Sequence, residues 1–324
     1  MTKALVTGVA GFIGSSLAIH LSHEGWDVVG VDSLTDYYEV SQKRQNLRDV
    51  ALCGVQVVEA DLLDEGVQLA NLLSDVEVVF HQAGQPGVRS SWEDGFGQYL
   101  CRNVLATQRL LEAVKGAGDI EFIYASSSSV YGHAQSWPCT EESIPRPFSP
   151  YGVTKLAGEH LVSLYAENFG LHTTSLRYFT VFGPRQRPDM AFHRFCQAAL
   201  TGQPIPVFGD GRQIRDFTFV DDVVRANIAA ASKPGGADVY NVAGGTHSSV
   251  ADVLQILGEI SPKSLNVQHH SRPPGDVLRT GGSISRAETE LMWSPRVSLA
   301  EGLAEQFDWH ARMAALRGTH DVGE

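Results

Sequence analysis

The stretch Ala4-Leu-Val-Thr-Gly8-Val-Ala-Gly11-Phe-Ile-Gly14 decides the fold of this chain of 324 residues. An apolar strand runs directly into a turn with three glycines, and the pattern of a helix begins inside that turn. Glycines permit the tight turn, and they let backbone amides at the start of the helix approach a pyrophosphate without a Cβ between them. A glycine-spaced turn alone is more often only a turn, so its meaning depends on the sequence around it.

The second predicted strand, Asp27–Asp32, ends on a carboxylate. In dinucleotide-binding folds an acidic residue at this place accepts hydrogen bonds from the adenosine ribose hydroxyls and repels a 2′-phosphate. The strand, the glycine turn, the helix and Asp32 together favour NAD over NADP as the cofactor. The contacts expected at this end of the cofactor are Gly8, Gly11, Phe12, Ile13, Gly14, Asp32 and Ser33.

The first half of the chain alternates apolar strands with helix-length amphipathic stretches. These runs are Ala4–Thr7, Phe12–Gly25, Asp27–Asp32, Val55–Glu59, Val76–His81, Tyr99–Lys115, Glu121–Ser126, Tyr151–Gly170 and Thr173–Tyr178. Such alternation is typical of a parallel sheet with helical crossovers, and near-continuous apolar strands predict a sheet covered on both faces. The sequence therefore predicts an α/β fold with a Rossmann-type doubly wound parallel sheet.

After residue 179, glycines and prolines interrupt the pattern, which predicts loops and short elements packed on the main scaffold. We expect residues 1–179 to form the NAD-binding Rossmann domain and residues 180–324 to form mainly a smaller, discontinuous C-terminal lobe that binds the substrate. A helix near Asp221–Ser232 and a strand near Val239–Ala243 are predicted to return to the first domain, which thus receives approximately residues 221–245. Leu299–Leu316 is predicted to be a helix with a frayed tail after it.

The composition excludes several classes of protein. The formal net charge is -12 and 43% of the residues are hydrophobic, an ordinary globular composition without the basic patch typical of nucleic-acid binding. No apolar run reaches the roughly 20 residues of a membrane span, and no secretory signal pattern opens the chain. The four cysteines lie far apart, and the pairs His20/His23 and His269/His270 lack a third ligand at metal spacing. We expect a cytoplasmic protein with reduced thiols and without metal, membrane or nucleic-acid partners.

Further cofactor contacts are expected after the third and fourth strands. Asp61 and Leu62 follow the third strand, where a carboxylate can meet the adenine amino group, although Asp61 as a helix N-cap is equally consistent. Gln82, Ala83 and Gly84 follow the fourth strand, where small residues let the cofactor backbone pass. Asn103 is expected either to bridge backbone segments beneath the cofactor or to make only a local hydrogen bond.

The strongest chemical signal is the pair Tyr151 and Lys155, which opens a predicted helix and lies on one face of it. A lysine ammonium near a phenol favours phenolate and lowers the pKa of the tyrosine, so Tyr151 is the expected general acid/base. A surface pair on an amphipathic helix is the alternative. Against it, four serines, Ser126-Ser-Ser-Ser129, end a central strand on the side where ligands bind in such sheets. Ser127 and Ser128 are expected to reach the substrate.

These motifs together resemble the extended short-chain dehydrogenase/reductases that act on nucleotide sugars, over essentially the whole chain. The resemblance rests on the glycine turn after Thr7, Asp32, the run His81-Gln-Ala-Gly84, the serines and the Tyr151/Lys155 pair. It implies that Ser126, Tyr151, Lys155 and Tyr178 also contact NAD. It further implies a homodimer formed through the helices Tyr99–Lys115 and Tyr151–Gly170.

Within this family the chain is most similar to the UDP-glucuronate 4-epimerases. Ser128 and Ser129 stand where sugar 4,6-dehydratases carry Asp and Glu, and UDP-glucuronate decarboxylases carry Glu at the place of Ser129. Thr180 stands where UDP-galactose 4-epimerases usually have Asn. The alternatives are a UDP-glucose 4-epimerase, a UDP-glucuronate decarboxylase and, outside enzymes, an NAD-sensing regulator on the same fold.

The resemblance also implies which residues bind the UDP-sugar. They are Ser127, Ser128, Thr180, Arg185, Arg187, Ala191, Val207, Phe208, Arg215, Arg272 and Asp276. Arg187, or else Arg185, offers a guanidinium fork for the C6 carboxylate. The chain departs from the family at Pro273, which replaces an arginine that binds the nucleotide, with Arg272 one position earlier.

The reaction that this resemblance implies is a redox-neutral inversion at C4 through a 4-keto sugar. Tyr151 takes the proton of the C4 hydroxyl while hydride passes from C4 to NAD, Ser127 binds the same oxygen and Lys155 binds the nicotinamide ribose. The keto sugar then turns over and takes the hydride back on its other face, so NAD stays bound. Because a ketone β to a carboxylate readily loses CO₂, Arg187, Ser128 and Thr180 are expected to restrain that carboxylate.

Overall fold

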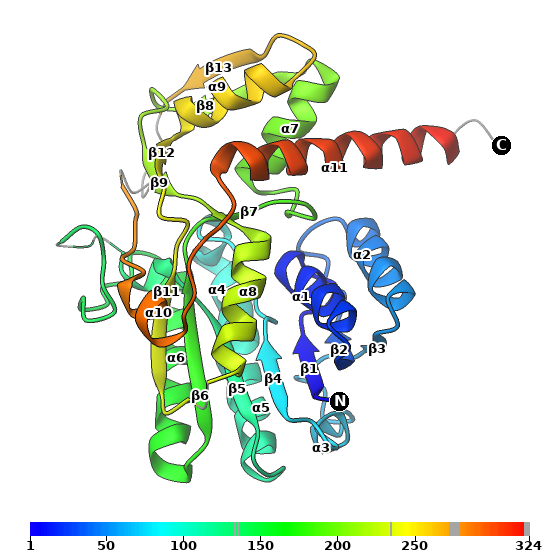
Figure 1. Cartoon of the computed structure of the whole chain (residues 1–324), viewed down its shortest axis with the longest axis vertical. Coiled ribbons are helices and arrows are strands. Elements are labelled where there is room, and N and C mark those ends of the chain that lie inside the picture. Colours follow the sequence, from blue (N-terminus) through cyan, green and yellow to red (C-terminus); the bar gives the residue numbers. More distant parts are fainter. Residues whose placement is uncertain (133, 135, 234, 272–278, 321–324) are drawn as a thin grey trace.

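A parallel sheet in the order β11-β6-β5-β4-β1-β2-β3 is the centre of the computed structural model (Figure 1). The structure describes residues 1–132, 134, 136–233, 235–271 and 279–320. Within these residues the seven strands are β1 (Lys3–Thr7), β2 (Asp27–Asp32), β3 (Gln56–Glu59), β4 (Val78–His81), β5 (Glu121–Ser127), β6 (His172–Tyr178) and β11 (Asp238–Val242). The strand order reverses at β1 and β4, and in doubly wound sheets ligands bind beyond the carboxyl ends of the strands at that point. The predicted Rossmann-type α/β fold is confirmed.

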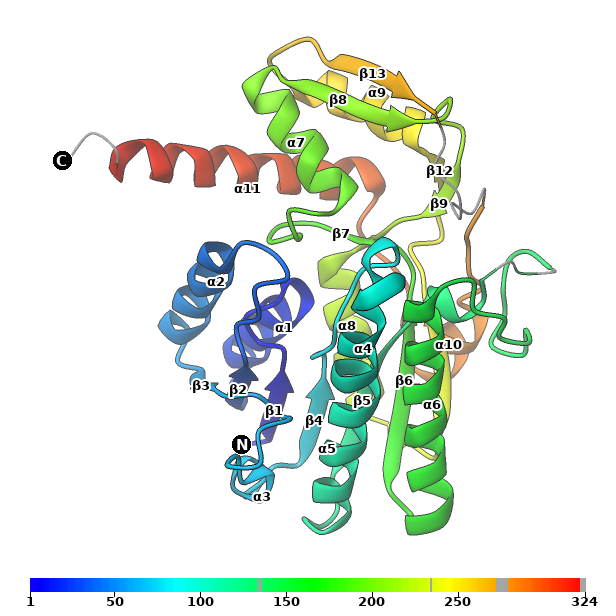
Figure 2. The same cartoon turned by 180° about the vertical axis from the view of Figure 1, so that it is seen from behind.

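Helices cover both faces of the sheet (Figures 1 and 2). One face carries α1 (Phe12–His23), α2 (Val40–Leu52) and α8 (Val220–Ala231), and the other carries α3 (Leu69–Leu72), α4 (Phe96–Tyr99), α5 (Ala106–Lys115) and α6 (Pro150–Phe169). Side chains alternate along β1, so that Ala4 and Val6 pack into one hydrophobic core while Leu5 packs into the other. Both cores are buried, which explains why β1, β2 and β4 are apolar over most of their length.

Local sequence fixes the start of α6 at the end of the sheet. Ser149 caps the helix by accepting a hydrogen bond from the amide of Gly152, and Pro150 occupies the first turn. Further along, Gly158 lets α6 lie against β5, because a Cβ there would come within 2.1 Å of the Tyr124 hydroxyl oxygen. The first turns of α6 therefore lie beside the carboxyl end of β5.

The chain leaves the sheet after β6 and later returns to it. α8 packs on α1, and β11 adds to the edge of the sheet with Val242 opposite Tyr178 on β6. α10 (Ser285–Glu290) then contacts β11.

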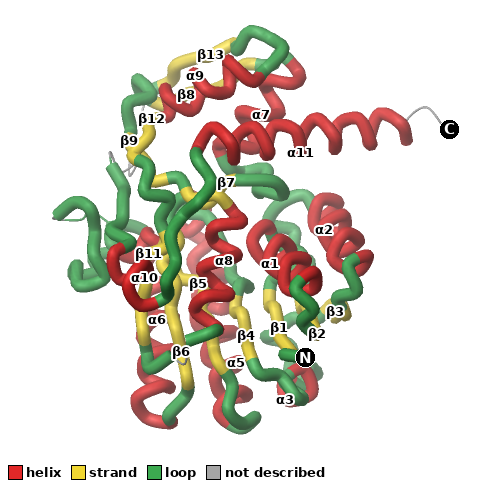
Figure 3. Tube along the Cα trace, in the orientation of Figure 1, coloured by secondary structure: helices red, strands yellow, loops and turns green. Residues whose placement is uncertain are grey.

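The other segments that follow β6, in the part of the chain that the structure describes, form a second lobe above the carboxyl ends of the strands (Figures 1 and 3). Its helices are α7 (Ala191–Thr201), α9 (Val250–Ile260) and α11 (Leu299–His320). Its strands form three short pairs, namely β7 (Val181–Phe182) with β10 (Thr218–Phe219), β8 (Pro204–Phe208) with β13 (Asn266–His270), and β9 (Ile214–Asp216) with β12 (His247–Ser249). No helix of the described residues is both long and apolar enough to cross a membrane.

Two details of the predicted elements, the start of one helix and the end of another, are wrong. The single predicted helix Tyr99–Lys115 begins at Phe96 and contains a π-helical segment, Leu100–Leu105, whose wider turn re-aims one buried side chain, described below. Val207 and Phe208, in a region expected to hold loops and short elements, belong to the short strand β8, which pairs with a strand far along the sequence. The helix expected to end at Leu316 continues to His320.

Candidate active site

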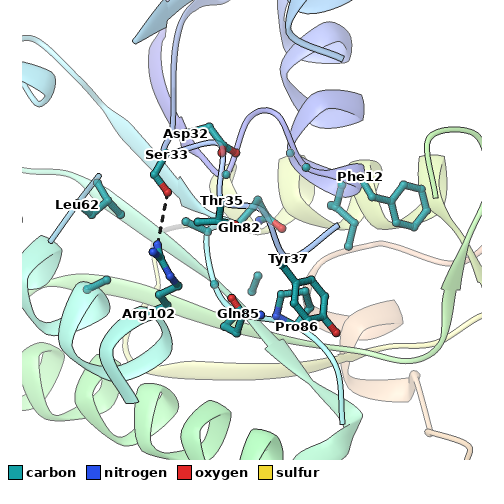
Figure 4. A pocket seen from close by; sticks show the side chains of 18 of the residues that line it. Phe12, Asp32, Ser33, Thr35, Tyr37, Leu62, Gln82, Gln85, Pro86 and Arg102 are labelled. Carbon is teal, nitrogen blue, oxygen red and sulfur yellow. Dashed lines mark hydrogen bonds between the residues drawn. The ribbon is translucent and has the colours of Figure 1, made fainter. Parts of the chain in front are cut away.

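A pocket opens beyond the carboxyl ends of β1, β2, β4 and β5 (Figure 4). Its lining includes nearly all of the cofactor contacts expected from the sequence: Gly8, Gly11, Phe12, Ile13, Gly14, Asp32, Ser33, Asp61, Leu62, Gln82, Ala83, Gly84, Ser126, Tyr151, Lys155 and Tyr178. Asn103 is the expected contact outside the lining. The glycine turn, the end of β2 and the start of α6 thus share one pocket.

The glycine turn forms a backbone cradle at the floor of the pocket. Gly8 has a φ of +71°, and a Cβ on it would lie 2.8 Å from the amide nitrogen of Ala83. A Cβ on Gly14 would lie 2.2 Å from the carbonyl oxygen of Gly8. Because these clashes are with backbone, the turn needs glycine at both positions, and it presents the amino end of α1 to the pocket. The cradle fits the pyrophosphate of a dinucleotide.

Asp32 lies at the mouth of this cradle. Its carboxylate accepts hydrogen bonds from the amides of Ala10 (3.0 Å) and Leu34 (2.8 Å), which fix both oxygens. Burial raises the pKa of Asp32, while these amides and the nearby positive charges of Lys43 and Arg102 act in the opposite direction. A fixed carboxylate at this place fits a ribose with two free hydroxyls.

Asp61 faces the same end of the pocket. One oxygen accepts a hydrogen bond from the amide of Leu63, and the other pairs with Arg102 at 3.2 Å. The same Arg102 nitrogen also lies 3.4 Å from the hydroxyl of Ser33 (Figure 4). Asp61 thus combines the local capping contact with a position in the pocket, and both interpretations of this residue stay open.

A buried histidine, for which no separate role was predicted, holds the end of β4. His81 contacts the hydroxyls of Thr7 (2.8 Å) and Thr107 (3.0 Å), and Thr7 in turn accepts a hydrogen bond from the amide of Ala83. Thr107 donates its proton to the carbonyl of Asn103, so it accepts from His81, which places the imidazole proton on Nε2. Burial, reinforced by Lys155, lowers the pKa of His81 to about 3. The imidazole is therefore a neutral structural link and not a proton donor to substrate.

The Asn103 side chain joins the backbone of the loop after β4 to a side chain of α6. Its side-chain oxygen accepts from the amide of Gln85 (2.6 Å), and its nitrogen donates to the carbonyl of Gln85 (3.1 Å) and to the hydroxyl of Thr154 (3.0 Å). This is the side chain that the π-helical segment aims inward. It connects the loop after β4 to Thr154 of α6, which directly precedes Lys155 of the reactive pair.

Tyr151, Ser127 and Lys155 lie together at the end of β5. The Ser127 hydroxyl acts on the Tyr151 phenol by lowering its pKa, and it accepts a hydrogen bond from the amide of Ser129 at 3.1 Å. Burial raises the pKa of Tyr151, while the Ser127 contact and the positive charge of Arg187 lower it. Burial lowers the pKa of Lys155 to about 8, and its ammonium group donates to the carbonyl of Ala125 at 2.8 Å.

This arrangement differs in one respect from the sequence-based interpretation. Lys155 was expected to favour the phenolate of Tyr151, but the ammonium points to the end of β5 and to Gly84, where a Cβ would lie 3.3 Å from Nζ. Ser127 and Arg187 act on the phenol instead.

Ser126 and Tyr178 line the pocket, and their hydroxyls contact other side chains of the protein. The hydroxyl of Ser126 donates to the buried carboxylate of Glu159. Tyr178 lies within hydrogen-bond distance of Asn227 (3.0 Å) and of Gln82 (3.2 Å). Both side chains therefore shape the pocket wall.

The two arginines proposed for the sugar carboxylate lie in different places. Arg187 is half-buried in the pocket that contains Tyr151, and Asp189 binds its Nε–Nη2 edge with two N···O distances of 2.9 Å. Because a guanidinium has five N–H groups, its Nη1–Nη2 edge can bind a second carboxylate. Arg185 instead pairs with Asp49 of α2 at 3.2 Å and lies outside the pocket lining.

The other expected substrate contacts lie apart from this lining. They are Ser128 and Thr180 near the ends of β5 and β6, Ala191 at the start of α7, and Val207, Phe208 and Arg215 on β8 and β9. Val207 is buried in the core of the second lobe. Arg272 and Asp276 fall outside the described residues.

Sequence reasoning missed the loop between β2 and α2. Its residues Thr35, Tyr37 and Tyr38 line the pocket, and Lys43 of α2 holds the loop by donating to the carbonyl and hydroxyl of Thr35. The Tyr37 hydroxyl contacts Ser90 at 2.9 Å across the pocket, and Figure 4 places its ring beside Pro86. Two adjacent tyrosines directly after the acidic strand end were the available signal.

A doubly wound sheet, a glycine cradle with a fixed carboxylate, and a tyrosine paired with serine and lysine define a dinucleotide-dependent enzyme of the short-chain dehydrogenase/reductase type. Among the described residues, no group of three or more His, Cys, Asp or Glu is placed to hold a metal ion. The chain belongs to the NAD dependent epimerase/dehydratase family, whose model matches residues 4–243. NAD is therefore its cofactor, and the pocket residues fit that group.

Three relatives show how far the similarity extends. An uncharacterized UDP-glucose epimerase of Bacillus subtilis, YtcB, is 40% identical over 94% of this chain and 96% of its own. A UDP-glucuronate 4-epimerase of Thermodesulfobacterium geofontis is 37% identical over 94% and 95%. The crystal structure of the UDP-glucuronic acid 4-epimerase from Bacillus cereus, in complex with UDP-glucuronic acid and NAD, is 42% identical, with a TM-score of 0.91 over 96% of this chain and 100% of that one.

Proposed function

We propose that this chain is a UDP-glucuronate 4-epimerase that interconverts UDP-glucuronate and UDP-galacturonate with tightly bound NAD. The similarity to enzymes of that name supports this activity. The observation that carries it within the site is Arg187, a guanidinium in the same pocket as the tyrosine that acts on C4. Ser128 and Ser129, where dehydratases and decarboxylases carry acids, leave no carboxylate there to remove the C5 proton.

The chain's residues have distinct tasks in this reaction. NAD, when bound, supplies a site that accepts a hydride from the sugar and returns it. Tyr151 removes the proton from the C4 hydroxyl and later gives it back, and Ser127 holds the same oxygen through its contact with the phenol. Lys155, buried beside Gly84, binds the ribose of the cofactor's reactive half.

Arg187 gives the site its preference for an acid. A ketone at C4 is β to the C6 carboxylate, and such acids lose CO₂ when the breaking bond aligns with the carbonyl π system. The Nη1–Nη2 edge of Arg187, together with Ser128 and Thr180, holds the carboxylate out of that alignment. Asp189 fixes the guanidinium plane from the opposite edge.

The deciding experiment incubates the purified protein with UDP-glucuronate and, separately, with UDP-glucose, without added NAD, and follows the sugar region by proton NMR. UDP-galacturonate from the first and little change in the second is the expected result. Conversion of UDP-glucose in place of UDP-glucuronate would make the protein a neutral-sugar epimerase, as the name of the Bacillus subtilis relative suggests. UDP-xylose as the main product would make it a decarboxylase.

Variants of the two arginines test the carboxylate site. Arg187→Ala should lower kcat/KM for UDP-glucuronate by roughly a hundredfold, as expected when a charged hydrogen-bonded partner is removed, and should release UDP-pentose. Arg185→Ala, the matched control, should keep the single product because its side chain pairs with Asp49 outside the pocket. Tyr151→Phe should abolish turnover with NAD retained, and normal turnover of this variant would refute the mechanism.

We propose further that the protein is a homodimer in the cytoplasm, paired through α5 and α6. The outer face of α6 and of the π-helical segment Leu100–Leu105, which leads into α5, exposes Leu100, Leu105, Val153 and Leu164 beside a shallow groove lined by Val104 and Leu161. Leu164→Glu should convert a dimer to a monomer in sedimentation experiments, whereas Met292→Glu, an exposed apolar side chain elsewhere, should not. A wild-type protein that sediments as a monomer would contradict this pairing.

A further inference from the structure

The C-terminal helix α11 reaches the loop that carries Arg187. The Gln306 side chain, fully buried on α11, donates to the side-chain oxygen of Gln186 at 3.0 Å and accepts from the backbone amide of Gly183 at 2.9 Å. One amide group therefore binds the first residue of the loop and the residue directly before Arg187. Gln306 itself lies outside the lining of the pocket.

Gln186 transmits this contact to the loop backbone. Its side chain is nearly fully buried, accepts from the amide of His193 at 2.8 Å and donates to the carbonyl of Val181 at 3.0 Å. Its own carbonyl accepts from Gln42 of α2 at 3.2 Å. Contacts from β7, α7, α11 and α2 thus fix the position of Gln186. Arg187 is the next residue in the chain, so its backbone begins at this fixed position.

We propose that Gln306 is a positioning residue for the acidic substrate, acting through Gln186 to hold the Arg187 guanidinium against the C6 carboxylate. This inference rests on the proposed epimerase function. A buried amide that makes both its hydrogen bonds stabilises one loop geometry, because moving the loop leaves polar groups unpaired in an apolar setting. An apolar side chain of the same size would fill the space without selecting that geometry.

The test uses Gln306→Met, which keeps the approximate volume and removes both hydrogen bonds. We expect kcat for epimerisation to fall roughly tenfold to a hundredfold, as for other small displacements of a positioning group, and UDP-pentose to appear beside UDP-galacturonate. Leu303→Ala, a buried apolar change in the same helix, is the control. It should lower the melting temperature without producing UDP-pentose.

A double variant separates positioning from general loosening of the fold. If Gln306 acts through Arg187, the Arg187→Ala/Gln306→Met protein should form no larger share of UDP-pentose than Arg187→Ala alone. A share of UDP-pentose in the double variant that equals the sum of the shares from the two single variants would overturn the proposal. A folded Gln306→Met protein that forms UDP-galacturonate only would also overturn it. If Gln306→Met does not fold, Gln306→Glu is the second variant. It keeps the shape of the side chain and the acceptor for the amide of Gly183 but loses the donor to Gln186. The ratio of UDP-pentose to UDP-galacturonate is measured in the same way.

The two proposals fail in different ways. If Arg187→Ala itself releases no UDP-pentose and epimerises normally, the carboxylate site is refuted. If Arg187→Ala releases UDP-pentose and neither Gln306 variant does, only the role of Gln306 is refuted.

Discussion

A single buried imidazole joins the ends of two strands in this protein. His81 lies between Thr7 of β1 and Thr107 of α5, fully buried and neutral. Its pKa, lowered to about 3, means that acid protonates it in the unfolded chain well before it does so in the folded protein. Falling pH through this window therefore favours the unfolded state.

We expect the pH dependence of stability to reveal this residue. Below its ordinary value of 6.5 the folded protein should lose about 1.4 kcal/mol per pH unit on account of His81. Asp216 acts in the opposite sense, because burial raises its pKa to about 7 and the folded state then holds the extra proton. Comparing urea unfolding of the wild type with that of His81→Asn isolates the histidine. The difference in unfolding free energy between the two proteins should change by about 1.4 kcal/mol per pH unit between about pH 6 and pH 4. Parallel plots of unfolding free energy against pH would contradict the assignment to His81.

The carboxylate of Asp32 should decide the choice of dinucleotide. Asp32→Asn keeps an acceptor but removes the charge, leaving Lys43 and Arg102 at this end of the pocket. We expect binding of NAD to weaken by roughly tenfold to a hundredfold, since one charged hydrogen bond is worth about 1.5–3 kcal/mol, and binding of NADP to become stronger. Thermal shifts with each dinucleotide measure this. Asp36→Asn, an exposed carboxylate of the same loop, is the control and should leave the preference for NAD unchanged.

Residue types predicted much of the site. Glycines in a turn, a strand-end acid, and a tyrosine and lysine one helical turn apart have few other reasons to occur together. The contact of Arg187 with Asp189 and the bridge from Gln306 were not predictable, because they depend on where irregular loops lie in space.

At the scale of elements, α6 shows how tightly a helix is seated on the sheet. Gly158 faces the ring of Tyr124, whose hydroxyl oxygen would lie 2.1 Å from an added Cβ. The same helix carries Tyr151 and Lys155, so any shift of α6 away from β5 moves the reactive groups.

Gly158→Ala should therefore lower stability by about 1–3 kcal/mol through overpacking and lower kcat as well. Gly258→Ala in α9 is the matched control, since the nearest atom to its added Cβ would be Leu265 Cδ1 at 3.8 Å. This control should be neutral, or more stable by about 0.4–1 kcal/mol. Chemical unfolding and steady-state assays of both variants test the expectation. Equal stabilities would mean that Tyr124 yields to the added methyl group.

Most elements of the sheet domain were predictable because their apolar periodicity agrees with their local end signals. α6 is an example, since Ser149 and Pro150 begin it and Gly170 ends it. The π-helical segment Leu100–Leu105 was not predictable, because its wider turn leaves the apolar pattern almost unchanged. Strand β8 was hidden for another reason, as its partner β13 lies some 60 residues further along, a separation that local patterns do not contain.

At the scale of the whole molecule, Asp222 joins the two lobes. This buried carboxylate of α8 accepts from the amides of Arg296 (3.0 Å) and Val297 (3.2 Å) and pairs with Arg225. Its carbonyl also accepts from the indole of Trp293 at 3.0 Å. The chain passes through this site immediately before α11 begins.

Asp222→Ala should lower the free energy of unfolding by about 2–3 kcal/mol, because it leaves two amides and a cation without their acceptor. Asp221→Ala removes the exposed neighbouring carboxylate and should change stability far less. Urea unfolding curves measure both. Similar losses in the two variants would show that Asp222 contributes no more than a surface charge.

The order of the strands has a consequence for how this protein is made. β6 is buried along nearly its whole length, yet its neighbour β11 is supplied by residues that follow it by about 60 positions. At roughly 5–20 residues per second, a ribosome leaves that edge of the nascent sheet unpaired for about 3–12 s. During this interval a strand that is buried in the finished protein is exposed to other chains, with the backbone groups of one edge unpaired. Chaperone capture of the growing polypeptide is therefore most needed between the emergence of Tyr178 and that of Val242.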